Sequence, residues 1–159
     1  MRQLTGFSLL FVMGTLVGSM FGMLVGFNPT QLSASTYIEQ QQVAIRALNT
    51  LMPAMGGACI VLLIVQSVLV RARPVAVAQL ACSMILMVTA GLITRFENQP
   101  INAIVLTWSA VAPASDWAEL RDTWWHWHIA RTLCAIAAYA IALGTLLGSA
   151  NDAPTAMRR

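Results

Sequence analysis

Four apolar runs decide what this chain can fold into. Each approaches the roughly 20 residues that an α-helix needs to cross a bilayer, and none contains Asp, Glu or Lys. Only 9% of all residues are charged, whereas soluble domains have about 25%. The pattern predicts an all-α integral membrane protein, a four-helix bundle, with transmembrane helices at residues 7–27, 54–70, 75–94 and 129–149.

These spans fill a single membrane domain at residues 1–150 and leave a flexible tail at residues 151–159. The first span is longer than the ~7–15 apolar residues of a signal peptide, so it is expected to be retained. The nine basic residues, all arginine, are too few and too scattered for a nucleic-acid surface. Three cysteines without a CxxC partner lie in apolar runs, as buried thiols do: Cys59, Cys82 and Cys134.

The positions of the arginines predict the orientation in the membrane. Arg71 and Arg73 lie in the short link between the second and third spans, and Arg2, Arg158 and Arg159 lie at the termini. Four crossings bring all five to one side, which the positive-inside rule makes cytoplasmic. We therefore expect both termini in the cytoplasm, in a bacterial inner membrane, with longer connections at residues 28–53 and 95–128 outside.

Both outer connections carry signals of helix starts. Thr36 and Glu39 form a capping box, which predicts a helix over residues 37–51 that meets the second span near Pro53. Asp116 and Glu119 give a second start, and no helix breaker follows before Gly144. The last span is therefore expected to extend outward as one long helix.

The first span has glycine at every fourth position, which predicts a small-residue packing face. Such a face lets another helix approach closely inside a membrane. The partner is either a helix of the same chain or a second copy in a homo-oligomer. The residues are Gly14, Gly18, Gly22 and Gly26.

The stretch from Trp117 to Arg131 holds both histidines and four of the five tryptophans. Tryptophan is common at membrane interfaces as an anchor, but an ionisable residue at membrane depth is costly and usually functional. Arg131, one helical turn beyond His128, favours a neutral imidazole, which a general base or a metal ligand requires. Helical spacing places six residues on one stripe: Arg121, Trp124, Trp125, His128, Arg131 and Thr132.

The second histidine does not belong to this stripe. Two residues of helix rotate His126 by about 200° from His128, where it is expected to pair with Asp122 four residues earlier. The His-x-His string is therefore not expected to bind a metal ion by itself.

A second polar cluster, from Arg95 to Asn102, follows the third span. Pro100 is expected to fix a turn there, while Asn98 and Asn102 supply hydrogen-bond donors and acceptors. Both clusters border the outer side, so they can meet in an apolar pocket between helices, the usual site for a small molecule. The first outer helix would supply a lid from Tyr37, Gln41 and Asn49.

Taken in order, these residues resemble the anthrone-oxygenase-like family of small membrane proteins over nearly the whole chain. The resemblance implies four transmembrane helices and, for some relatives, oxygenation of an anthrone to an anthraquinone; many relatives have no assigned activity. His126 is not part of the family pattern. The residues that carry the resemblance are Asn28-Pro29, Asn49, Met52-Pro53, Asn98-x-Pro100-Ile101-Asn102, Trp108, Trp117, Arg121 and Trp125-x-x-His128-x-x-Arg131-Thr132.

The first functional hypothesis is a membrane oxygenase for a small apolar aromatic substrate, anthrone-like or quinol-like, in a pocket at the outer leaflet. His128 would remove an acidic proton, and Arg131 with Asn98 or Asn102 would hold the resulting oxyanion. A stabilised carbanion can react with dioxygen directly, so this version needs no cofactor.

Two alternatives remain open. One is a b-type haem protein in which His128 binds the iron beside Trp125 and the propionates pair with Arg95, Arg121 and Arg131. The other is a structural or assembly subunit of a membrane complex that packs through the glycine face of the first span.

Overall fold

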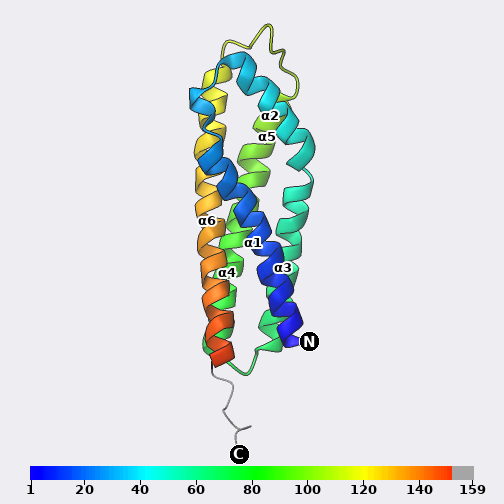
Figure 1. Cartoon of the computed structure of the whole chain (residues 1–159), viewed down its shortest axis with the longest axis vertical. Coiled ribbons are helices and arrows are strands. Elements are labelled where there is room, and N and C mark those ends of the chain that lie inside the picture. Colours follow the sequence, from blue (N-terminus) through cyan, green and yellow to red (C-terminus); the bar gives the residue numbers. More distant parts are fainter. Residues whose placement is uncertain (152–159) are drawn as a thin grey trace, which may run out of the picture.

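The computed structural model describes residues 1–151 as a bundle of long helices (Figure 1). Residues 152–159 lie outside the described part, and with them nearly all of the predicted tail and the two C-terminal arginines, Arg158 and Arg159. Four long helices form the bundle: α1 (Arg2–Gly26), α3 (Leu51–Leu69), α4 (Pro74–Ile93) and α6 (Trp117–Asn151). No β-strand forms within residues 1–151, so the all-α prediction is confirmed.

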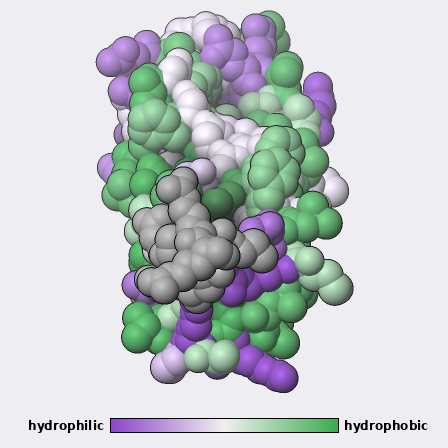
Figure 2. Space-filling model, turned by 60° about the horizontal axis from the view of Figure 1, so that its bottom comes forward, coloured by the Kyte–Doolittle hydropathy of each residue, from purple (hydrophilic) through white to green (hydrophobic). Residues whose placement is uncertain are grey.

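Each long helix is apolar and long enough to cross a membrane. The candidate spans are residues 2–31, 51–69, 74–105 and 117–148, so four membrane-spanning helices are confirmed and each is longer than predicted. Large apolar side chains are exposed along the bundle, among them Phe7, Phe11, Ile85 and Leu133. Figure 2 shows hydrophobic side chains along the sides and hydrophilic ones toward the ends. The chain is an integral membrane protein.

The end of the bundle where α1 begins, α6 ends and α3 turns into α4 is called the lower end, as drawn in Figure 1. The core there is built from Leu9, Met13, Leu63 and Leu80, none of which is exposed. α6 faces this core with alanines, which bring the helix backbones close together. Ser83 Oγ donates a hydrogen bond of 2.8 Å to the carbonyl of Ala138, which ties α4 to α6.

The upper end is closed by η1 (Pro29–Gln31) and α2 (Ala34–Leu48). α2 begins three residues before the predicted start, because Ser33 and not Thr36 is its cap: Ser33 Oγ accepts from the backbone N–H of Thr36 at 3.3 Å. The chain breaks at Asn49 and Thr50, also earlier than predicted. Pro53 lies in the first turn of α3, where its missing N–H leaves no hydrogen bond broken.

The prediction that Pro100 fixes a turn after the third span is wrong. The chain instead continues through η2 (Thr94–Asn98), one π-helical turn, into α5 (Gln99–Val105). The Gln99 N–H bonds to the carbonyl of Thr94, five residues back. This wider turn accommodates the ring of Pro100, which would clash with the carbonyl four residues earlier in a regular helix. It also directs Asn98 and Asn102 into the bundle, where both are buried.

The predicted outward extension of the last span is confirmed. α6 is one helix of 35 residues, with Asp116 just before it. The Asp116 carbonyl accepts from the Leu120 N–H at 3.1 Å, which closes the first turn. The cluster from Trp117 to Arg131 therefore belongs to the same rigid element as the lower core.

Of the four glycines on the predicted packing face of α1, only Gly14 lies against another helix of the same chain. A Cβ atom on Gly14 would lie 3.2 Å from the Tyr139 hydroxyl, so α1 and α6 approach closely there. A four-residue step rotates a helix by about 40° beyond a full turn, so the later glycines turn away. Gly18, Gly22 and Gly26 are exposed with no atom within 4 Å of a built Cβ, and a homo-oligomer through them stays a prediction.

Candidate functional site

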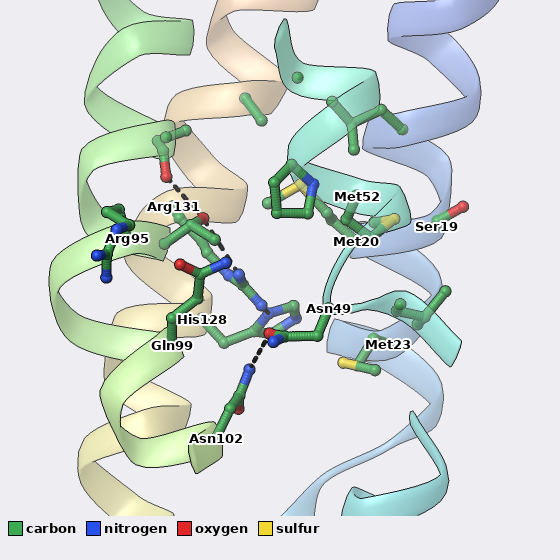
Figure 3. Close-up of a pocket in the computed structure, with 18 of the residues that line it drawn as sticks. Ser19, Met20, Met23, Asn49, Met52, Arg95, Gln99, Asn102, His128 and Arg131 are labelled. Carbon is green, nitrogen blue, oxygen red and sulfur yellow. Dashed lines mark hydrogen bonds between the residues drawn. The ribbon is translucent and has the colours of Figure 1, made fainter. Parts of the chain in front are cut away.

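A cavity of about 410 Å³ lies in the upper half of the bundle and is lined by residues of all six α-helices. Small-molecule sites occupy about 300–1,000 Å³. Most of the wall is apolar, with four methionines that can adapt to a ligand's shape: Met20, Met23, Met52 and Met87. Figure 3 shows His128, Asn49 and Gln99 between the methionines on one side and α4 with α5 on the other. The shape suits a mostly apolar ligand with a few polar atoms.

The wall that α6 contributes carries a half-buried arginine bound to a buried histidine. Arg131 Nε and Nη2 lie 3.3 and 3.1 Å from His128 Nδ1, and Arg131 Nη1 donates to Thr94 Oγ1 at 3.2 Å. A guanidinium group can only donate, so Nδ1 is the acceptor and the neutral ring carries its proton on Nε2. The i, i+3 spacing on α6 brings the two side chains together.

Two tryptophans hold the His128 ring in place. The Trp124 ring stacks parallel to it at 5.2 Å between centroids, and the Trp125 ring stacks at 5.5 Å. Thr132 Oγ1 donates to the His128 carbonyl at 2.7 Å. His128 is 1% exposed, so its ring has one orientation in a fully packed environment.

A hydrogen-bonded chain through two side-chain amides, here called the amide chain, runs along the cavity wall beside this pair. Trp124 Nε1 donates to Asn102 Oδ1, and Asn102 Nδ2 donates to Asn49 Oδ1, both at 2.8 Å. Asn98 is buried behind Trp124 and donates to its carbonyl at 3.0 Å. The chain connects α6, α5 and the α2–α3 junction, and it orients Asn49 at the cavity wall.

Gln41 on α2 brings an unpaired polar group to the cavity. It lines the cavity, it is 1% exposed, and its Oε1 has no hydrogen-bond partner. A buried acceptor without a partner is costly, and such atoms in native proteins usually bind water or a ligand. A ligand with a hydroxyl group would supply the missing donor.

The cavity unites the two polar clusters, since Arg95 and Asn102 line it together with His128 and Arg131. Gln41 and Asn49 of the expected lid also line it. The other predicted site residues do not: Asn98, Arg121, Trp125 and Tyr37. Tyr37 is buried against Trp117 at 6.1 Å between ring centroids, and burial raises the pKa of its hydroxyl.

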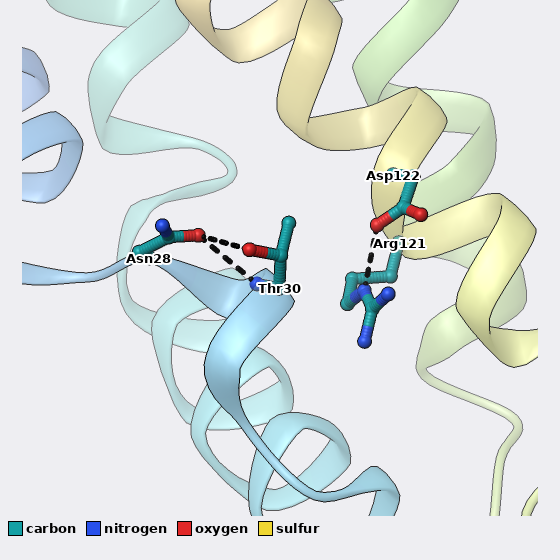
Figure 4. Close-up of polar contacts among 4 residues, drawn as sticks. All are labelled: Asn28, Thr30, Arg121 and Asp122. Atoms are coloured by element: carbon teal, nitrogen blue, oxygen red, sulfur yellow. Dashed lines mark hydrogen bonds and ion pairs between the residues drawn. The ribbon is translucent and has the colours of Figure 1, made fainter.

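Arg121 is bound elsewhere, above the cavity. Its Nε donates to Asp122 at 2.8 Å, and its guanidinium lies 4.7 Å from the Trp117 ring centroid (Figure 4). The predicted pairing of Asp122 with His126 is wrong, because the adjacent arginine binds this carboxylate and His126 is exposed. Figure 4 also shows Asn28 Oδ1 accepting from Thr30, the cap that orders the chain after α1.

Sequence reasoning missed Thr94 and Gln99 as cavity residues. The π-helical turn shifts the helix face between them, so neither a regular helix nor a turn predicts their direction. It also missed three cavity-lining glycines, Gly56, Gly57 and Gly91, because glycine has no side chain that signals a site.

The alternative of a haem requires an imidazole nitrogen that faces open space. Arg131 covers Nδ1 of His128, and Nε2 is buried without a hydrogen-bond partner. Of the three arginines predicted to hold propionates, Arg121 points elsewhere. Placed in this way, the residues do not fit a haem ligated by His128.

Comparison with known proteins gives a match to one sequence family. The sequence model of the anthrone oxygenase family matches residues 41–141. This range starts within α2 and ends within α6, and it includes both polar clusters. No curated protein and no solved structure matches the chain significantly. The chain thus belongs to the anthrone oxygenase family, as the resemblance of its motifs predicted.

Proposed function

We propose that this protein is a membrane oxygenase that oxidises a hydroxylated aromatic of anthrone or quinol type in the upper cavity. The observation that carries the proposal is the Arg131–His128 pair at the wall of a mostly apolar cavity. A fixed cation beside a neutral base is what an acidic C–H or phenol requires in order to ionise away from water. Membership of the family supports the reaction class.

For an anthrone, the reaction replaces the ring CH₂ by C=O. His128 takes one methylene proton, and the negative charge moves to the oxygen of the anthrone ketone, which Arg131 holds. The carbanion gives electrons to dioxygen and forms a C–O bond, which yields a hydroperoxide after protonation. Loss of the second methylene hydrogen with cleavage of the O–O bond releases water, so CH₂ and O₂ become C=O and H₂O.

For a quinol, the same groups would act on two hydroxyl protons. The quinol would lose two protons and two electrons, and dioxygen would become hydrogen peroxide. The two substrate types therefore differ in a measurable product, water or hydrogen peroxide.

The other polar residues of the site have supporting roles in this proposal. The substrate oxygen replaces His128 Nδ1 as the partner of Arg131, which frees Nδ1 to accept the proton. The Gln41 and Asn49 amides bind substrate hydroxyls. Asn102 and Asn98 are positioning residues, because they hold Asn49 and the Trp124 backbone.

The test is oxygen consumption and quinone absorbance with 1,8-dihydroxyanthrone, for protein in lipid nanodiscs and corrected for spontaneous oxidation. Loss of a general base costs about 10²–10⁴ in rate, so we expect His128→Ala and His128→Gln to lose at least a hundredfold. The glutamine variant matters most, since its amide oxygen can still accept from Arg131 but cannot carry a proton. Wild-type turnover in correctly folded His128→Gln would overturn the assignment.

A further inference from the structure

We propose that the cavity opens sideways into the bilayer between α3 and α4, and that Gly57 and Gly91 form this mouth and limit the substrate to flat ring systems. The inference rests on the proposed function for the chemistry inside the cavity. The position of the mouth is inferred separately, from which cavity-lining residues are exposed on the outside of the bundle.

Five cavity-lining residues are exposed, and four of them lie on two facing helix edges. Pro53 and Gly57 are one helical turn apart on α3, and Gly91 and Arg95 are one turn apart on α4 and η2. The fifth, Ser19, is on α1 and donates its hydroxyl to the Thr15 carbonyl of its own helix. A residue that is both exposed and cavity-lining marks an opening, so the opening follows the α3 and α4 edges.

The glycines leave this opening clear. A Cβ atom built on Gly57 or on Gly91 meets no atom within 4 Å, and the same holds for Gly56 just inside the wall. The space beside each backbone is therefore empty and not filled by a neighbouring side chain. Two bare backbones on opposite edges admit a thin molecule, while side chains at these positions would project into its path.

The mouth lies at the depth of the lipid tails. By the rise of an α-helix, Gly91 is about 26 Å from the lower end of α4 and Gly57 about 18 Å from the lower end of α3. The hydrocarbon core of a bilayer is about 30 Å thick. Arg95, one turn above Gly91, comes near the boundary where an arginine side chain reaches the headgroups.

The chemistry along this path selects a class of ligand. A fused aromatic dissolves in the lipid tails and can pass edge-first between the α3 and α4 edges that carry the two glycines. Arg95 at the rim attracts a phenolic or phenolate oxygen. Inside, the unpaired Gln41 Oε1 accepts from a hydroxyl of the ligand. The expected ligand is therefore a planar polycyclic phenol that partitions into membranes.

The experiment measures how fast 1,8-dihydroxyanthraquinone, a stable product analogue, quenches tryptophan fluorescence of the protein in nanodiscs. We expect Gly57→Leu and Gly91→Leu to slow association by about tenfold each, as obstruction of an entry gate does. Gly22→Leu is the matched control, because Gly22 is exposed with empty space around it but does not line the cavity. The association rate of the wild type should follow the mole fraction of ligand in the lipid and not its concentration in the total volume.

The readouts separate the mouth from the reaction. Slower association in both leucine variants with unchanged melting temperatures supports the mouth, even if no variant oxidises 1,8-dihydroxyanthrone. Association at the wild-type rate in both variants overturns the mouth and leaves the proposed reaction in place. Failure of the wild type to bind the anthraquinone overturns the inference as well. In turnover assays the mouth predicts a raised KM with kcat preserved, unlike His128→Gln, which lowers kcat.

Discussion

At the scale of the residue, Trp124 joins the parts of the site. Its ring stacks on His128 and lies 5.8 Å from the Arg131 guanidinium, its Nε1 donates to Asn102, and its carbonyl accepts from Asn98. One side chain thus orients the proposed base, the cation and the amide chain. A position with so many partners is expected to be sensitive to a small chemical change.

Trp124→Phe tests this directly. The variant keeps an aromatic ring on His128 but leaves the partly buried Asn102 Oδ1 without a donor, which costs about 1–3 kcal/mol of unfolding free energy. We expect a lower melting temperature in detergent and weaker binding of 1,8-dihydroxyanthraquinone. Trp127→Phe is the control, because the half-buried Trp127 makes no hydrogen bond among the described residues.

A double variant adds a second check on the same bond. If the Trp124–Asn102 bond is the cause, Asn102→Ala should destabilise the Trp124→Phe protein less than it destabilises the wild type. Additive effects of the two substitutions would contradict this explanation.

At the scale of the element, the six-helix wall of the cavity depends on how α2 is held against α5. Gln42 Nε2 donates to the carbonyls of Val105 and Trp108, each at 2.9 Å. Val105 is the last residue of α5, and its carbonyl also accepts from the Trp108 N–H at 3.1 Å, while Trp108 lies three residues beyond the helix. The amide therefore fastens α2 to the end of α5 and to the segment that follows it.

Gln42→Ala should loosen this cover while the spans stay folded. We expect faster proteolysis and faster amide exchange at residues 106–116, with little change within α3 and α4. Gln40→Ala is the matched control, since Gln40 is an exposed residue of the same helix. Uniform destabilisation of all helices would show that Gln42 supports the entire bundle and not only the cover.

The elements also differ in how far the sequence alone predicts them. The four spans follow from run length, because a bilayer requires about 20 apolar residues whatever their neighbours are. The π-helical turn at Thr94–Asn98 does not follow from run length, and its hydrogen bonds to α6, from Asn98 to the Trp124 carbonyl and from Arg131 to Thr94, join residues far apart in the sequence. This one π-helical turn is why the prediction of a turn fixed by Pro100 failed and why Thr94 and Gln99 were missed as cavity residues.

At the scale of the molecule, the sequence predicted that the two polar clusters border one side but not which members share the cavity. A helix stripe fixes relative directions within α6, and His128 and Arg131 fall together as expected. It does not fix the rotation of α5 against α6, which places Asn102 at the wall and Asn98 behind Trp124. Side chains on one predicted stripe can also point in different directions when one of them has a closer partner. Arg121 binds the adjacent Asp122 and does not line the cavity with His128 and Arg131.

The orientation of the whole molecule gives the last prediction. The fold places the Val70–Arg73 turn at the lower end and residues 106–116 at the upper end, and Arg71 and Arg73 predict that the lower end is cytoplasmic. Single cysteines replacing Ala72 and Ala110, in a protein whose native cysteines are serine, report each end. A membrane-impermeant maleimide should label Ala110→Cys in intact cells, and Ala72→Cys only after the membrane is opened. The reverse labelling pattern would show that the orientation is inverted and that the cavity lies in the cytoplasmic leaflet. Labelling of both cysteines in intact cells would contradict the four-span topology itself.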